Sequence, residues 1–330
     1  MYNEYFGKKI LIIGGSGTIG NYLVRRLLQE EPQVIRIFSR DEHKQYEMNI
    51  EFQEDANRLR YLIGDVRDLQ RLTRAMEGID YVFHLAAMKH VPSCEYNPFE
   101  AVQTNVIGTQ NVIQAALENN VTKVLFTSTD KAISPTNTYG ATKLTAERLI
   151  SAAEYQKGSR KTIFSSVRFG NVMGSRGSVI PLFKKQILES GEITITDPDM
   201  LRYMMTPTQA IELILQANEL ASGGEVFVLK MPVIRIGDLA EVVVEMVSKK
   251  YDMDKSIGIK CIGLRPGEKR YEELMTLDEQ LIAVEKEDMF IIPSLIKGNK
   301  SAMAIETPET TLRPVSKSVV FDWLHSENMV

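Results

Sequence analysis

A glycine-rich turn near the start of the chain constrains the fold more than any other feature. The segment Gly14-Gly15-Ser16-Gly17-Thr18-Ile19-Gly20 follows the apolar run Ile10–Ile13 and leads into a helical pattern. Glycine has no Cβ, so the turn can be tight, a phosphate can approach the backbone, and the helix N-terminus can direct N–H groups at the anion. A strand, a glycine turn and a helix in this order predict a dinucleotide-binding unit. The predicted phosphate-binding residues are Gly14, Ser16, Gly17, Thr18, Ile19 and Gly20.

Short aliphatic runs alternate with longer amphipathic segments from residue 9 to residue 129. Runs of this length, bounded by glycine, aspartate or polar residues, are typical of buried parallel strands, and the segments between them have helical spacing. The alternation predicts the α/β class, with a Rossmann doubly wound parallel sheet. The predicted strands are Ile10–Ile13, Val34–Phe38, Leu59–Ile63, Tyr81–Leu85, Val124–Thr127 and Ile163–Arg168, and the predicted helices are Gly20–Glu30, Leu69–Met76, Val102–Asn119 and Tyr139–Tyr155.

The alternation becomes less regular after Arg168, where loops containing glycine and proline follow. We therefore expect an NAD(P)-binding Rossmann domain over residues 1–170 and a smaller C-terminal substrate-binding lobe that takes up most of residues 171–330. The chain is expected to return to the main sheet over about residues 226–263, through a strand at Val226–Leu229, a helix at Ile236–Tyr251 and a run at Ile259–Gly263. Residues 297–314, rich in Thr, Ser, Pro and Lys, predict a surface excursion.

Composition narrows the class of partner. The 330 residues carry a formal net charge of −4 without a basic block, so we expect no nucleic-acid partner. The two cysteines, Cys94 and Cys261, are far apart, which argues against a disulfide framework and fits a reducing cytosol. No apolar run approaches the ~20 residues that a membrane span requires, and the four histidines lack metal-ligand spacing. These features predict a cytoplasmic protein with no membrane association and no metal.

The end of the second predicted strand discriminates between NAD and NADP. An acidic residue there would bind the adenosine ribose hydroxyls and repel a 2′-phosphate, whereas this chain has Ser39 and Arg40. A 2′-phosphate would meet the Ser39 hydroxyl and the cations of Arg40 and Lys44, which favours NADP. In the alternative, Arg40 stacks on the adenine of NAD and Lys44 is solvated. The residues that follow the third and fourth strands are also expected to contact the cofactor: Asp65, Val66, Leu85, Ala86 and Ala87.

Tyr139 and Lys143 are four residues apart in a helical segment and therefore share one helix face. A cation beside a phenol favours the phenolate, which can take a proton from a sugar hydroxyl as the carbon gives hydride to nicotinamide. Together with the glycine turn and with Ser128-Thr129 at a strand end, Tyr139 and Lys143 make the sequence resemble the extended short-chain dehydrogenase/reductase family. The resemblance covers nearly the whole chain. The resemblance implies a Rossmann domain with a small C-terminal substrate lobe, in which Tyr139 and Lys143 serve both the cofactor and catalysis.

The segment Thr129-Asp130-Lys131 separates two reactions within that family. Epimerisation at C4 needs only hydride removal, rotation and hydride return, whereas 4,6-dehydration also needs an acid and a base near C5 and C6. Asp130 and Lys131 meet that demand. In the alternative, Asp130 caps a turn and Lys131 points to solvent. The predicted catalytic residues are Thr129, Asp130, Lys131, Tyr139 and Lys143.

Four segments resemble the soluble UDP-N-acetylglucosamine 4,6-dehydratases: Ser128–Ala132, Tyr139–Lys143, Arg168–Val172 and Arg265–Lys269. The resemblance implies a cycle in which Tyr139 takes the C4 hydroxyl proton, Lys131 removes the C5 proton and Asp130 protonates the departing C6 hydroxyl. Lys131 stands where dTDP-glucose 4,6-dehydratases carry a glutamate. Because a lysine is a base only when neutral, we expect burial or the nearby Lys89 and His90 to lower its pKa.

The resemblance also indicates the substrate site. Asn171 is expected to hydrogen-bond the diphosphate or sugar, Arg202 and Arg265 to bind phosphates, and Glu268 to bind ribose hydroxyls. With Lys89, these are the predicted substrate-binding residues. The expected substrate is UDP-N-acetylglucosamine, and the family implies a homo-oligomer.

The expected product is a UDP-2-acetamido-2,6-dideoxy-hexos-4-ulose for surface glycan biosynthesis. Residues 265–274 resemble the retaining relatives more than the inverting ones, which favours retention at C5. Two alternatives stay open: a UDP-sugar 4-epimerase, and a non-catalytic Rossmann protein that senses NADP.

Overall fold

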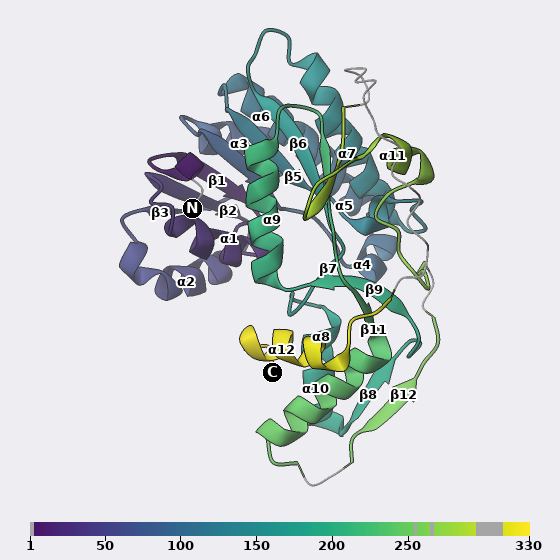
Figure 1. The fold of residues 1–330 in the computed structure, drawn as a ribbon. Helices are drawn as coiled ribbons and strands as arrows, with labels where there is room; N and C mark the ends of the chain where they lie inside the picture. Colours follow the sequence, from purple (N-terminus) through teal and green to yellow (C-terminus); the bar gives the residue numbers. More distant parts are fainter. Residues whose placement is uncertain (1–2, 254–255, 265–266, 295–312) are drawn as a thin grey trace.

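The computed structural model describes residues 3–253, 256–264, 267–294 and 313–330, and a nine-stranded sheet forms its larger part (Figure 1). The strand order is β13-β14-β10-β6-β5-β4-β1-β2-β3, in which the seven strands from β10 to β3 run parallel and β13 and β14 add an antiparallel edge. The predicted doubly wound Rossmann sheet is confirmed. The strands are β1 Lys9–Ile13, β2 Val34–Ser39, β3 Leu59–Ile63, β4 Tyr81–His84, β5 Lys123–Thr127, β6 Ile163–Arg168, β10 Val226–Leu229, β13 Val284–Glu285 and β14 Met289–Ile292.

Helices cover both faces of this sheet, which is why most residues of its central strands are buried and apolar. Alternate residues of β1 enter different cores: Ile10 and Ile12 pack toward α1 and α9, whereas Leu11 and Ile13 pack toward α3, α6 and α7. The predicted helix Val102–Asn119 is in fact α5, a π-helical turn at Gln103–Ile107, and α6. The helices are α1 Thr18–Leu28, α2 Glu42–Glu51, α3 Leu69–Met76, α4 Val91–Tyr96, α5 Pro98–Val102, α6 Gly108–Glu118, α7 Thr138–Gln156, α9 Pro207–Leu220 and α11 Leu277–Ile282.

A separate core holds together a second group of elements, which we call the small lobe (Figure 1). The helices α8, α10 and α12 pack there around residues such as Phe183, Ile234 and Leu239. Two short sheets complete the lobe, with strand orders β11-β9-β7 and β12-β8. Its elements are β7 Asn171–Val172, α8 Val179–Ser190, β8 Glu192–Ile195, β9 Leu201–Met205, β11 Val233–Arg235, α10 Ile236–Lys250, β12 Gly258–Cys261 and α12 Lys317–Ser326.

Two predictions for the C-terminal half need correction. The run at Ile259–Gly263 does not join the main sheet, because it forms β12, which pairs with β8 in the small lobe. The main sheet is instead extended by β14, which pairs with β10, so its later contributions are Val226–Leu229 and residues 284–292.

The predicted surface excursion at 297–314 lies outside the described residues apart from its last two. In the described part of the chain, no helix has the length and apolar character to cross a bilayer.

Candidate active site

The glycine turn opens a cavity of about 580 Å³ at the carboxyl ends of β1 to β4. This is where doubly wound sheets bind dinucleotides. Residues predicted to bind the cofactor make up most of its lining: Gly14, Ser16, Gly17, Thr18, Ile19, Gly20, Ser39, Arg40, Lys44, Val66, Leu85, Ala86 and Ala87. Asp65 is not part of the lining, because its carboxylate accepts hydrogen bonds from the main chain and side chain of Arg67.

The backbone at this turn leaves no room for side chains. Gly14 has φ +83°, and a Cβ there would lie 2.8 Å from the amide nitrogen of Ala86. A Cβ on Gly20 would lie 2.3 Å from the carbonyl oxygen of Gly15. Helix α1 begins directly after the turn, and its N-cap, Gly17, offers no side-chain cap to the first N–H groups. Free helix N–H groups beside an open glycine cradle suit a diphosphate, so these residues fit a nicotinamide dinucleotide.

The adenosine end of this cavity carries cations that are already paired with carboxylates. Lys44 lies 2.5 Å from Asp41, and Arg40 lies 3.7 Å from Asp65. The Ser39 hydroxyl accepts hydrogen bonds from the Ser16 hydroxyl at 2.8 Å and from the Gln45 amide at 2.9 Å. Sequence reasoning missed Gln45, because a glutamine one helical turn into α2 carries no distinctive signal.

Arg176 is a second residue that sequence reasoning missed. It lies in the loop after β7, yet its guanidinium donates to the carbonyl oxygen of Ser16 at 2.8 Å, and its backbone N–H donates to the Thr18 hydroxyl at 3.2 Å. It therefore lines the cofactor cavity from the small lobe. Only the fold brings this loop to the glycine turn, and the glycine residues around Arg176 were the one available signal.

The predicted acid–base pair stands at the end of β5, in a short 3₁₀ turn, Asp130–Ala132. Asp130 is fully buried, and its Oδ1 accepts hydrogen bonds from the Thr129 hydroxyl at 2.9 Å, the Lys131 backbone N–H at 2.8 Å and Lys131 Nζ at 3.0 Å. Its Oδ2 has no hydrogen-bond partner among the described residues. A Cβ on Gly170 would lie 2.8 Å from this oxygen, so glycine is needed there to leave it space.

Lys131 does not have the lowered pKa that we expected. Burial does lower it, but the carboxylates of Asp130 and Glu272 outweigh burial and raise the pKa of the ammonium above its usual range. Glu272 Oε1 lies 4.0 Å from Lys131 Nζ. The repulsion between the two lysines is seen at Lys89 itself: burial lowers its pKa, and the charges of Arg176 and Lys131 lower it further. The expectation failed because it left out the charge of Asp130, the larger of the two effects, and that of Glu272, which comes from a distant part of the chain.

Tyr139 and Lys143 share one face of α7, as predicted, but their electrostatics differ from the prediction. Burial raises the pKa of the Tyr139 phenol, while Lys131 and a hydrogen bond with Thr129 lower it. Lys143 donates to the Thr127 carbonyl oxygen at 2.5 Å, and its Nζ lies 3.9 Å from the centre of the Phe126 ring. Burial lowers the pKa of Lys143 to about 7, against the charge of Glu147. The cation that acts on the phenol in this arrangement is Lys131.

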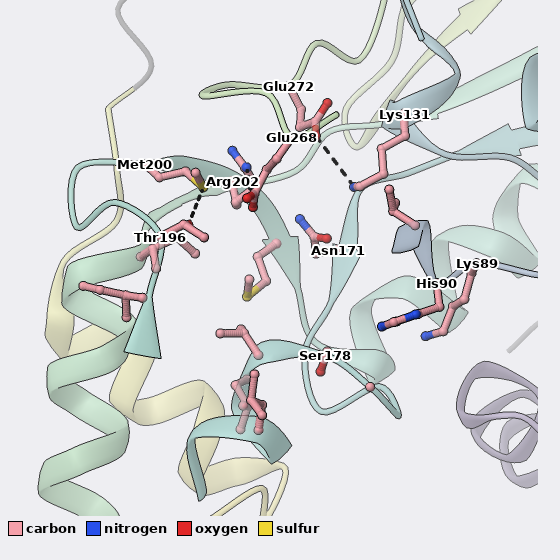
Figure 2. A pocket seen from close by; sticks show the side chains of 18 of the residues that line it. Lys89, His90, Lys131, Asn171, Ser178, Thr196, Met200, Arg202, Glu268 and Glu272 are labelled. Atoms are coloured by element: carbon pink, nitrogen blue, oxygen red, sulfur yellow. Dashed lines mark hydrogen bonds and ion pairs between the residues drawn. The ribbon is translucent and has the colours of Figure 1, made fainter. Parts of the chain in front are cut away.

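A second cavity, of about 310 Å³, lies between the end of the main sheet and the small lobe, and Figure 2 shows its wall. Asn171 is held by a hydrogen bond to the carbonyl oxygen of Tyr203 at 3.1 Å. The Arg202 guanidinium donates to the carbonyl oxygens of Lys269 and Arg270 at 2.6 and 2.9 Å, so it also anchors the segment that carries Glu268. The ionisable and amide residues in the lining are Lys89, His90, Lys131, Asn137, Asn171, Arg202, Glu268 and Glu272.

Four of the five predicted substrate-binding residues therefore line the same cavity as Lys131, the predicted base. The four are Lys89, Asn171, Arg202 and Glu268. Arg265 lies outside the described residues. Glu272 is a third residue that sequence reasoning missed. The only signal available was its place in the stretch after the resemblance segment Arg265–Lys269. Among the described residues, no group of His, Cys, Asp and Glu is arranged to hold a metal ion.

Residues 10–294 match the model of a family described as "Polysaccharide biosynthesis protein". The chain belongs to this family. A solved structure, Pen from Bacillus thuringiensis, is 56% identical, covers all of both chains and has a TM-score of 0.94. A Campylobacter jejuni protein named UDP-N-acetylglucosamine 4,6-dehydratase (inverting) is 45% identical over 88% of this chain and 84% of its own. A Rickettsia rickettsii protein named UDP-glucose 4-epimerase is 42% identical over the same shares.

These relatives confirm the resemblance to nucleotide-sugar enzymes of the extended short-chain dehydrogenase/reductase type. They also confirm the enzyme prediction at the level of the family, because the Campylobacter and Rickettsia proteins carry enzyme names. Their names divide between dehydration and epimerisation, so the choice between these reactions depends on the residues of this chain.

Proposed function

We propose that the protein removes water from UDP-N-acetylglucosamine and forms a UDP-2-acetamido-2,6-dideoxy-hexos-4-ulose for surface glycan biosynthesis. One observation carries the proposal: Asp130 and Lys131 form a hydrogen-bonded pair of 3.0 Å between Nζ and Oδ1 beside the cavity that Lys131 lines. An epimerase has no step for this acid and base, whereas elimination needs both.

The residues divide the reaction between two sides of the site. A nicotinamide cofactor, when bound in the cavity at the glycine turn, would supply the acceptor for a hydride from C4 and the donor of a hydride to C6. Tyr139 takes the proton of the C4 hydroxyl; burial raises the pKa of its phenol, and Lys131 and Thr129 oppose burial by stabilising the phenolate. Oxidation at C4 acidifies the C5 proton, which Lys131 removes, and Asp130 protonates the C6 hydroxyl as it leaves.

The hydrogen bond between Lys131 and Asp130 explains how both groups reach the required protonation states. Transfer of one proton from Nζ to Oδ1 turns an ammonium and a carboxylate into an amine and a carboxylic acid. The site keeps its net charge, and the base and the acid form in the same step. Burial under a bound sugar favours this neutral pair, because charged groups lose their solvation.

We propose NADP as the cofactor. Arg40, Lys44 and Arg176 line the cofactor cavity together with a single carboxylate, that of Asp41. This excess of positive charge supports recognition of a 2′-phosphate. The cytoplasmic location and the homo-oligomer expected from the sequence remain parts of the proposal.

At C5 we propose inversion. The names of the similar Campylobacter proteins support it, since two of them, 44% and 45% identical to this chain, are called inverting. The likeness of residues 265–274 to retaining relatives favours the opposite outcome. Incubation with UDP-N-acetylglucosamine in D₂O and an NMR spectrum of the fresh product would report the sugar, the loss of water and the C5 configuration together.

The competing function is a UDP-sugar 4-epimerase, which the names of the Rickettsia relatives support. The product mass separates the two reactions. We expect a product lighter by one water. An unchanged mass with UDP-N-acetylglucosamine, together with 4-epimer formation, would contradict dehydration.

A further inference from the structure

Three ionisable side chains meet at the wall of the substrate cavity, and only two of them have a role in the proposed reaction. Lys131 Nζ lies 3.0 Å from Asp130 Oδ1 and 4.0 Å from Glu272 Oε1. Figure 2 shows Glu272 reaching toward Lys131 from the segment that follows β12. The third member, Glu272, therefore belongs to the same charged cluster as the proposed acid and base.

This cluster holds two carboxylates against one ammonium in a buried place. The side chains of Asp130 and Glu272 are 0% and 6% exposed, while that of Lys131 is 21% exposed. Each carboxylate has one buried oxygen without a hydrogen-bond partner among the described residues, Oδ2 of Asp130 and Oε2 of Glu272. A buried oxygen without a hydrogen bond lowers the stability of the fold. If the two carboxylates had only a structural role, we would therefore expect these oxygens to be paired.

We propose that Glu272 is a positioning residue that controls when Lys131 releases its proton. Its carboxylate, with that of Asp130, holds the Lys131 ammonium at the cavity wall in the resting site. The inference rests on the proposed function for its place in the reaction, but its contact with Lys131 does not depend on the substrate.

The sign of the effect follows from the geometry. The proton moves from Lys131 Nζ to Asp130 Oδ1, so the N–H bond breaks, an O–H bond forms, and no further reactant is needed. Glu272 Oε1 lies 4.0 Å from Nζ, so its negative charge stabilises the ammonium and opposes this transfer. In agreement, the charge of Glu272 raises the pKa of Lys131. Burial raises the pKa of Glu272 itself, and the charge of Lys131 opposes that shift by favouring the carboxylate.

Other charged groups around the cluster also affect the pKa values of Lys131 and Glu272. Around Lys131, the charge of Asp130 stabilises the ammonium, as does the Tyr139 phenolate when it forms, and Lys89 lies near enough to be affected by Lys131. Around Glu272, Lys131, Arg202 and Lys269 stabilise the carboxylate, whereas the charge of Asp130 opposes it. Replacement of Glu272 by glutamine leaves each of these groups in place, so the variant isolates one negative charge.

The test measures the protonation of Lys131 in the cofactor-loaded enzyme without substrate. The enzyme is treated with a trace of acetic anhydride at a series of pH values, and mass spectrometry of the Lys131 peptide gives the midpoint of acetylation. We expect the midpoint in Glu272→Gln to lie about one pH unit below that of the wild type, as for loss of an opposite charge at this distance. With UDP-N-acetylglucosamine, the pH at half-maximal water loss should move in the same direction.

Two further variants keep the test decisive. Glu273→Gln removes the neighbouring carboxylate, which is exposed, and should leave the midpoint unchanged. Glu272→Asp keeps the charge but draws it back from Lys131, so it should shift the midpoint less than glutamine and in the same direction. If Glu272→Gln does not fold, Glu272→Asp still gives a measurable shift.

An acetylation midpoint for Lys131 that is the same in wild type, Glu272→Gln and Glu272→Asp would overturn the inference. This outcome is distinct from failure of the proposed function. A shifted midpoint in an enzyme that removes no water from UDP-N-acetylglucosamine supports the control of Lys131 and contradicts dehydration. Water loss with an unshifted midpoint supports dehydration and contradicts the role of Glu272.

Discussion

The two cavities of the molecule place their charges in opposite ways. The cofactor cavity carries its cations at an exposed rim, where the Arg40 side chain is 58% exposed. The substrate cavity carries carboxylates in its buried wall, where Asp130 is fully buried. Exposed charges interact weakly and rearrange at little cost, whereas buried charges interact strongly and shift one another's pKa. The rim is therefore suited to capture phosphate, and the wall is suited to move protons.

The largest effect that this contrast predicts is for Tyr139→Phe. The phenol is the proposed acceptor of the C4 hydroxyl proton, and loss of a general base costs about 10²–10⁴-fold in rate. We expect a fall of that size in C4 oxidation, followed as the absorbance of reduced cofactor in a single turnover. Cofactor affinity, measured by fluorescence, should change much less.

Tyr46→Phe is the matched control, because Tyr46 is exposed on α2. It should leave the oxidation rate unchanged. Full activity in Tyr139→Phe would show that the phenol does not accept the C4 hydroxyl proton. The buried side of the site would then not be the place of proton transfer, which would contradict the contrast between the two cavities.

The cofactor cavity should be most sensitive at its backbone rather than at its charges. In Gly14→Ala the new Cβ would lie 2.8 Å from the Ala86 nitrogen at φ +83°. Strain of this kind costs about 1–3 kcal/mol, which corresponds to about 5–150-fold in affinity. We expect a loss of that size in the affinity for NADP, measured by calorimetry.

Gly7→Ala provides a control with a similar backbone strain. Gly7 has φ +67°, but a Cβ there would meet no atom within 4 Å, and Gly7 does not line the cavity. It should lower stability and leave NADP affinity intact. Equal losses of affinity in both variants would mean that the Gly14 effect is a general destabilisation.

Lys143 allows a test of burial through the pH dependence of stability. Its pKa is about 7 in the folded protein, below the ordinary value of about 10.5 that the unfolded chain has. Between these values the unfolded chain binds the proton more readily, so the folded protein should gain stability as pH rises from 7. The gain relative to Lys143→Met is about 1.4 kcal/mol for each pH unit, measured by urea unfolding.

Lys185→Met should show no such trend, since Lys185 is exposed on α8. A stability difference between wild type and Lys143→Met that does not change with pH would show that Lys143 titrates normally. The buried environment would then have less effect on proton transfer than we argue.

The cofactor cavity was largely predictable because one short stretch of chain builds it. Glycine, strand and helix signals between residues 10 and 87 lie next to one another, so local rules suffice. The exceptions are Gln45, which has no distinctive signal, and Arg176, which arrives from the small lobe.

The substrate cavity was less predictable because distant segments build it. Motif resemblance indicated Asp130, Lys131 and Asn171, but the pKa of Lys131 also depends on Glu272, which no local pattern connects to it. The small lobe shows the same limit. A strand-like run at Ile259–Gly263 predicts a strand but cannot specify its partner, and the partner is β8 rather than the main sheet.

The smallest predicted effect concerns the rim of the cofactor cavity. Arg40 lies 3.7 Å from Asp65, whose carboxylate already accepts two hydrogen bonds from the Arg67 side chain. Arg40 can therefore turn to a 2′-phosphate at little cost, but its exposure limits what the contact contributes. We expect Arg40→Ala to weaken NADP binding about tenfold and to leave NAD binding unchanged.

The effect of Arg40→Ala should shrink as salt rises, because exposed charges are screened. Arg60→Ala, which removes an exposed arginine from β3, should change neither affinity. A loss of NAD affinity equal to the loss of NADP affinity would indicate that Arg40 contacts the adenine instead of a phosphate. Arg40 would then stack on the adenine, and the preference for NADP would have to come from Lys44 and Arg176.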